Sequence, residues 1–180
     1  MILTYKQCLK KFKTDYQIKR LLESKKLFKI SKGYYSDNKH YLEYELLFLK
    51  YPNAVFTLNS AFYYHGLTDT IPNKYYLATD RDHAKIKDKN IKQVFVDKRV
   101  MNHGIQKIKY NGQEITIYNK ERMLVELLKN KSKLPFDYYK EIVNNYRKIV
   151  YSLDIRKIEE YINYSGRKNS ISQKLSSEIL

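Results

Sequence analysis

Cysteine is nearly absent from the 180-residue sequence, because Cys8 is the only one. An internal disulfide bond is therefore excluded, and a reducing cytosol is the expected environment. No apolar run reaches the length that a membrane-spanning helix needs. The stretch that follows Met1 also lacks the continuous apolar segment of a signal peptide. We therefore expect a cytoplasmic protein without a membrane partner.

The residue patterns of common metal and catalytic sites are missing as well. The histidines are too widely spaced for a short metal-ligand motif, and they are His40, His65, His83 and His103. The sequence has no glycine-rich phosphate loop and no nucleophile elbow. We expect no metal, no cofactor and no catalytic residue, so the protein is not predicted to be an enzyme.

One pair of carboxylates keeps an enzymatic alternative open. Asp80 and Asp82 follow a predicted strand, and such a pair could hold Mg²⁺ for nucleotidyl transfer. That chemistry also needs a glycine-rich turn upstream to hold the phosphates, and Asn59-Ser60 is not one. A solvated charged loop explains the pair better, so a nucleotidyltransferase-like enzyme is the weaker alternative.

Positive charge is what the sequence has in excess. Its 35 lysine and arginine residues outnumber 19 acidic residues and give a net charge of +16. Such a charge favours a polyanionic partner, although a lysine-rich chain from an AT-rich genome would look similar. Residues 1–39 contain eleven basic and three acidic residues, which gives +8 of that +16. This concentration predicts an N-terminal binding head, residues 1–40.

Two helix-start signals stand ten residues apart in the head. Thr4 and Thr14 are each followed three residues later by glutamine, which is the spacing of a capping box. Apolar residues recur at helical spacing after Thr4, and Ile18, Leu21 and Leu22 form one apolar face after Thr14. The short link between the helices predicts that they pack as a helix-turn-helix pair.

A basic hairpin is predicted directly after the second helix. Residues 27–30 and 34–36 are strand-like, and Ser31-Lys32-Gly33 connects them. Gly33 supplies the positive φ that a three-residue hairpin connection needs. A helix-turn-helix pair followed by a hairpin is a winged-helix arrangement. Its second helix would enter the major groove of DNA, and its hairpin would contact an adjacent groove or the backbone.

Side-chain chemistry assigns roles to the predicted DNA contacts. Gln17 can pair bidentately with adenine, Arg20 can pair with guanine, and Tyr16 can stack or contact a phosphate. Lysines suit phosphates, which position a protein without specifying sequence. The full set of predicted DNA-binding residues is Lys13, Thr14, Tyr16, Gln17, Lys19, Arg20, Lys25, Lys26, Lys32 and Tyr34.

Two other interpretations of the head remain open at this point. An RNA-binding regulator would stack single-stranded bases on Tyr16, Tyr34 or Tyr35. Alternatively, the head is a small helical cap with a solvated basic surface. Competition between duplex DNA and single-stranded RNA separates the first alternative from the DNA-binding hypothesis.

Residues 41–180 are expected to form an α+β domain, with a small, mainly antiparallel sheet and helices against it. Helices are predicted over 41–50, 58–65, 120–130, from 135 onward, and over 154–164. Strands are predicted over 74–79, 91–97, 105–110 and 114–118, and the last two flank the hairpin signal Asn111-Gly112. The tail after Arg167 is expected to be weakly ordered or a marginal helix.

Five stretches of the chain occur in a characteristic order. They are Ser-Lys-Gly-Tyr-Tyr at 31–35, Tyr-Pro-Asn-Ala-Val at 51–55, Ser-Ala at 60–61, His-Gly-Leu-Thr-Asp at 65–69, and residues 117–126. Over nearly all of 1–165, their order and spacing resemble the AbiEi-type antitoxins of bacterial abortive-infection (type IV) toxin–antitoxin systems. Residues 117–126 resemble the family's E-R-T-L-x-D segment, with Met123 in place of Thr and Glu126 in place of Asp. Within it, we expect Glu121 to complement the helix dipole and Arg122 to pair with a carboxylate.

The resemblance implies a repressor of its own operon that also counteracts a nucleotidyltransferase-like toxin, which confers phage resistance. In that family the winged helix reads inverted repeats in promoter DNA, and the C-terminal part supports the antitoxin role without a stable toxin complex. Many relatives carry an extra helix before the helix-turn-helix pair, whereas this chain begins almost at Thr4. We therefore expect a monomer in solution whose head depends on the body for folding and binds DNA cooperatively.

Overall fold

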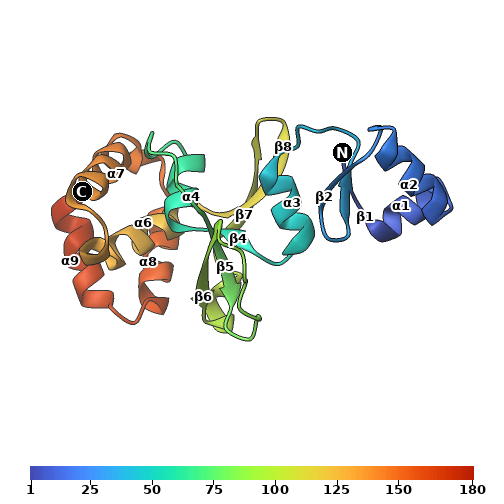
Figure 1. Cartoon of the computed structure of the whole chain (residues 1–180). Coiled ribbons are helices and arrows are strands. Elements are labelled where there is room, and N and C mark those ends of the chain that lie inside the picture. The colour runs from blue at the N-terminus through green and yellow to red at the C-terminus, as the bar shows by residue number, and fades with distance from the viewer. The chain divides into compact units, whose positions relative to one another are not determined.

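The computed structural model describes all residues from Met1 to Leu180. The chain divides into two compact units, unit 1 (Met1–Pro52) and unit 2 (Asn53–Leu180). Both units combine helices with strands (Figure 1), so the predicted α+β class is confirmed. The division falls after Pro52, whereas the sequence suggested a boundary at residue 40. No helix is both long enough and apolar enough to cross a membrane.

Unit 1 is built on a small antiparallel sheet. Its elements in chain order are β1 (Ile2–Thr4), α1 (Tyr5–Phe12), α2 (Asp15–Glu23), β2 (Phe28–Ser31), β3 (Tyr34–Ser36) and α3 (Glu43–Lys50). The strand β3 lies in the middle and pairs with β1 on one side and β2 on the other. The two helices and the hairpin occur where the sequence predicts them. The strand β1 was not predicted, because three residues are too few to show an alternating pattern.

Threonine caps begin both helices, but only the first capping box is complete. The Thr4 side chain accepts the Gln7 N–H, and the Gln7 side chain accepts the Thr4 N–H at 2.8 Å. Thr14 accepts the Gln17 N–H at 3.3 Å, but the Gln17 side chain makes no return bond. The second predicted capping box is therefore half formed. Its Gln17 amide stays available for a ligand.

A small apolar core holds α1 and α2 against the sheet. Its members are Leu3, Cys8, Ile18, Leu27 and Tyr35, with Leu9, Phe12, Leu21 and Leu22 packed around them. Helix α3 belongs to the same unit because polar contacts tie it to the strands. The Ile2 N–H donates to Glu45 at 3.3 Å, and the Tyr34 hydroxyl donates to the Leu49 carbonyl at 3.5 Å.

Unit 2 contains a five-stranded sheet with the strand order β6-β5-β4-β8-β7. The strands are β4 (Val55–Phe56), β5 (Tyr75–Asp80), β6 (Ile91–Val96), β7 (Ile105–Tyr110) and β8 (Gln113–Tyr118). The β7–β8 pair is the antiparallel hairpin that the sequence predicts. The β4–β5 pair is also antiparallel, although β4 was not predicted. The β5–β6 and β4–β8 pairs are parallel, so the sheet is mixed. The predicted charged loop, residues 80–90, makes the crossover that joins β5 to β6.

Helices cover the sheet and form the C-terminal part of unit 2. They are α4 (Leu58–Tyr64), α5 (Lys98–Met101), α6 (Lys120–Lys129), α7 (Phe136–Ile149), α8 (Ile155–Tyr164) and α9 (Lys168–Glu178). Figure 1 shows α6, α7, α8 and α9 gathered around the C-terminus. The tail after Arg167 is a regular helix, α9, that contacts α6 and α8 and buries Ile171 and Leu175.

Candidate functional site

The exposed face of α2 brings four of the predicted DNA contacts together. Ile18 is the only buried residue of this helix. The side chains on the opposite side lie in solvent, and they are Tyr16, Gln17, Lys19 and Arg20. Tyr16 keeps 68 % of its surface exposed, which is unusual for a large aromatic residue. None of these four side chains has a hydrogen-bond or ion-pair partner in the protein, so all are free to contact a ligand.

A groove of about 570 Å³ lies between the end of α1 and the exposed face of α2. Four of its eight lining residues are cationic and none is acidic, and the eight are Lys11, Phe12, Lys13, Gln17, Arg20, Leu21, Ser24 and Lys26. The groove therefore brings Lys13 and Lys26 together with Gln17 and Arg20, the residues predicted to pair with bases. Lys11, in the last turn of α1, also lines the groove and is not among the contacts predicted from the sequence.

Two predicted phosphate contacts have a strained backbone. Lys13, between α1 and α2, has φ 68°, and Lys25, just after α2, has φ 54°. A residue with a Cβ pays about 1–2 kcal/mol for such a conformation. Strain of this kind concentrates at functional sites, where surrounding structure holds it in place. Both lysines border α2, which favours a function for this surface over a merely solvated one.

The remaining predicted contacts differ in how available they are. Lys32 is exposed at the turn of the β2–β3 hairpin, where Gly33 has the expected positive φ of 79°. The Thr14 hydroxyl is occupied as the cap of α2. Tyr34 is half-buried, and its ring lies 5.9 Å from Lys50 Nζ. Tyr34 therefore serves mainly the packing of α3 and is the least accessible residue of the predicted set.

The only acidic residue in the first turn of α2 is already engaged. The Tyr5 hydroxyl donates to Asp15 Oδ1 at 2.6 Å, and this hydrogen bond raises the pKa of Tyr5 above its usual value. The Asp15 carboxylate is therefore bound within the protein, by Tyr5 of α1. The cationic groove meets no competing carboxylate among its lining residues.

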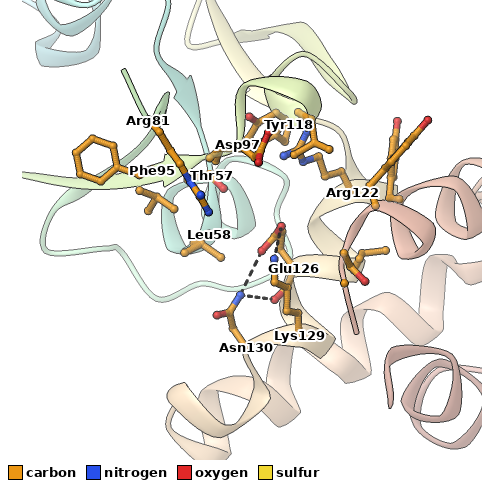
Figure 2. A pocket seen from close by; sticks show the side chains of 18 of the residues that line it. Thr57, Leu58, Arg81, Phe95, Asp97, Tyr118, Arg122, Glu126, Lys129 and Asn130 are labelled. Carbon is orange, nitrogen blue, oxygen red and sulfur yellow. Dashed lines mark hydrogen bonds and ion pairs between the residues drawn. The ribbon is translucent and has the colours of Figure 1, made fainter. Parts of the chain in front are cut away.

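Unit 2 has a second candidate site, a pocket of about 410 Å³ (Figure 2). Its walls come from the crossover after β5, the end of β6, α5, α6 and the end of α8. The cationic residues that line it are Arg81, Arg122, Lys129 and Lys133, and the acidic ones are Asp97 and Glu126. Figure 2 shows Arg81 at one side of this pocket and Arg122 at the other.

Arg122 is an almost fully buried charge without a carboxylate partner. It is 5 % exposed, its Nη1 donates to the carbonyls of Val100 and His103, and its guanidinium lies 3.8 Å from the centroid of the Tyr118 ring. The expected pairing with a carboxylate is therefore wrong. Burial raises the pKa of Tyr118 to about 12, so this ring stays neutral and gives Arg122 no anionic partner.

Both acidic residues of the pocket are bound to other groups. Asp97 accepts two N–H bonds from the Arg99 guanidinium at 3.0 and 2.9 Å, and this pairing holds the pKa of Asp97 far below its usual range. Glu126 lies 3.7 Å from Lys129 Nζ and accepts a hydrogen bond from Asn130 (Figure 2). The pocket therefore keeps an excess of positive charge.

The residues considered for metal binding and nucleotidyl transfer belong to no larger cluster of potential metal ligands. Asp80 ends β5, and Asp82 is exposed with its carboxylate 3.8 Å from Lys98 Nζ. No group of three or more histidine, cysteine or acidic side chains lies together anywhere in the structure. His65 follows α4 as its C-cap, where burial lowers its pKa and its ring contacts the Tyr118 carbonyl at 2.7 Å.

Comparison of the chain with models of known protein families gives no match, and comparison with curated protein sequences gives none either.

Proposed function

We propose that the protein is a sequence-specific DNA-binding regulator in which α2 reads the major groove. The observation that carries this proposal is the exposed face of α2, where Tyr16, Gln17 and Arg20 have no protein partners. Of these, Gln17 and Arg20 line a groove that also contains Lys11, Lys13 and Lys26. Glutamine and arginine are the side chains that pair bidentately with adenine and guanine. Lys13 and Lys26 in the same groove suit the flanking phosphates.

The order of elements in unit 1 supports a winged-helix interpretation. Strand β1, helices α1 and α2, and the hairpin β2–β3 follow one another, with β3 between β1 and β2 in the sheet. In such an arrangement the second helix enters the major groove and the hairpin is the wing. Lys32, exposed at the hairpin turn, then contacts a phosphate beside the groove.

Exposure of the tyrosines favours duplex DNA over single-stranded RNA. Stacking of successive bases needs several accessible rings on one platform. Tyr16 is accessible, but Tyr35 is 8 % exposed in the core and Tyr34 is half-buried. Of the three tyrosines proposed for stacking, only Tyr16 is exposed, which fits backbone contacts to a duplex better than a stacking platform.

The salt dependence of binding tests this proposal. Lys13→Gly and Lys32→Ala are each expected to weaken binding to all duplex DNA similarly and to lower the slope of log K against log salt by about one unit. Glycine is chosen at Lys13 because it also relieves φ 68°, so stability should rise by about 0.5–1 kcal/mol while affinity falls. Fluorescence anisotropy at several salt concentrations measures the slope, and urea unfolding measures stability.

The matched control is Lys109→Ala, which removes one exposed charge from β7 in unit 2. For this variant, the slope of log K against log salt should equal that of the unmodified protein. A single-stranded RNA of equal length serves as competitor in the same assay. Stronger binding to RNA than to the duplex, or unchanged slopes in both lysine variants, would contradict the DNA-binding proposal.

The resemblance to AbiEi-type antitoxins extends the proposal to the biological role. We propose a cytoplasmic autorepressor that also counteracts a nucleotidyltransferase-like toxin of the same operon without a stable complex. The two activities should be separable, because the resemblance assigns them to different parts of the chain. Co-expression with the neighbouring toxin should restore growth, and the Gln17→Ala/Arg20→Ala protein should restore it equally while failing to repress a promoter fusion. Loss of both activities in that variant would contradict this division of roles.

A further inference from the structure

The pocket in unit 2 takes no part in the proposed reading of DNA. We propose that this pocket binds a nucleoside phosphate, with the phosphate on its cationic side chains and the base against its exposed aromatic rings. The proposal does not depend on the DNA-binding role of unit 1. It rests on the charge, the aromatic lining, the size and the local strain of the pocket.

The excess positive charge of the pocket favours binding of an anion. Arg81 and Lys133 are exposed and form no ion pair, and Arg122 is buried without one. Both hydrogen bonds of Arg122 use Nη1, so its Nε and Nη2 donate to no protein oxygen. Arg122 has hydrogen bonds but no anionic partner, and a buried charge is favourable only when it is both paired and hydrogen-bonded. The planar fork of a guanidinium matches two phosphate oxygens, which makes phosphate the anion that fits best.

The aromatic side chains that line the pocket favour a ligand with a planar group next to its anionic group. Phe95 and Tyr164 both line the pocket, and they keep 46 % and 51 % of their surface exposed. The Tyr164 ring is held in place by the His103 ring, whose centroid lies 4.7 Å away. In proteins that bind single-stranded nucleic acid, bases stack on exposed aromatic rings while cationic side chains contact the phosphates, and the same pairing suits a nucleoside phosphate. An inorganic anion would leave both rings unused.

The size and the strain of the pocket fit a bound small molecule. Its volume of about 410 Å³ lies within the range of roughly 300–1,000 Å³ that is usual for small-molecule sites. Leu58, on its wall, has a positive φ of 43°, which is a rare conformation for a bulky residue. Backbone strain is retained preferentially where it shapes a functional site.

Isothermal titration calorimetry of the full chain tests the proposal, with ATP, adenosine and inorganic triphosphate as probes at 150 mM salt. ATP should bind saturably, and both adenosine and triphosphate should bind more weakly. The Arg81→Ala/Lys133→Ala protein should lose about tenfold in ATP affinity, because charge-assisted bonds are removed. Both residues are exposed, so the variant should fold, and its melting temperature checks this. Lys109→Ala, which removes a charge outside the pocket, is the control and should bind ATP normally.

The aromatic side chains are tested separately. Phe95→Ala and Tyr164→Ala should weaken ATP binding but leave triphosphate binding unchanged, because only the base contacts the rings. A 5′-phosphorylated RNA oligonucleotide tests whether the same chemistry comes from a chain end. Absence of ATP binding at millimolar concentration, an equal loss in Lys109→Ala, triphosphate binding as tight as that of ATP, or binding of the RNA end alone would each overturn the proposal.

Discussion

Alanine at Gln17 or Arg20 is expected to weaken binding to the cognate operator by about 1–3 kcal/mol, while binding to unrelated duplex DNA stays nearly unchanged. Both side chains are exposed on α2 and unpaired in the protein, so their replacement costs the fold little. The loss arises because each forms a bidentate pair with one base, which a phosphate contact cannot replace. Selection of sites from random duplexes, followed by anisotropy on the selected and scrambled sequences, measures both affinities.

Arg20→Lys is the control that separates base-specific pairing from non-specific attraction between charges. Lysine keeps the positive charge but lacks the planar fork that matches guanine. This variant should therefore keep its affinity for scrambled DNA and lose discrimination at one base position. If alanine at both positions leaves operator binding intact, or lowers affinity equally for every sequence, α2 is not the recognition helix.

Local signals in the sequence predicted most of the helices, and longer-range contacts account for what was missed. Capping threonines and apolar spacing are sufficient to predict α1 and α2. Strand β4 is two residues long and is defined by its pairing with β5 and β8, which lie far along the chain. Its own sequence is too short to predict it. Helix α3 groups with unit 1, and its bonds to Ile2 and Tyr34 cannot be inferred from the spacing of its own apolar residues.

The two candidate sites also differ in how far they can be predicted from local sequence. The face of α2 is a property of one helix, so the period of its apolar residues was enough to indicate which side chains are exposed. The pocket of unit 2 is assembled from β6, α5, α6 and α8, and no short motif connects them. Arg122 illustrates the difference, since its partners are the backbone carbonyls of Val100 and His103, which carry no residue-specific pattern.

Gly104→Ala is expected to cause a large loss of stability, about 3 kcal/mol or more. Gly104 has φ 76°, and an added Cβ would lie 2.9 Å from Asn119 Oδ1 and 3.1 Å from the Tyr161 hydroxyl. Neither neighbour can move freely. Asn119 caps α6, donates from Nδ2 to the Tyr161 hydroxyl at 3.1 Å, and donates its N–H to the Gly104 carbonyl at 2.7 Å.

Gly112→Ala provides the matched control, because Gly112 has nearly the same φ, 79°, but no atom within 4 Å of an added Cβ. Gly112→Ala should lower stability by only about 1–2 kcal/mol, which is the cost of a positive φ for a residue with a Cβ. Urea unfolding of both variants measures the difference, and equal losses would show that the Asn119 junction adjusts to a methyl group. The excess loss at Gly104 measures how firmly this junction is packed. Because Arg122 and Tyr161 meet there and also line the pocket, Gly104→Ala should weaken ATP binding too, whereas Gly112→Ala should not.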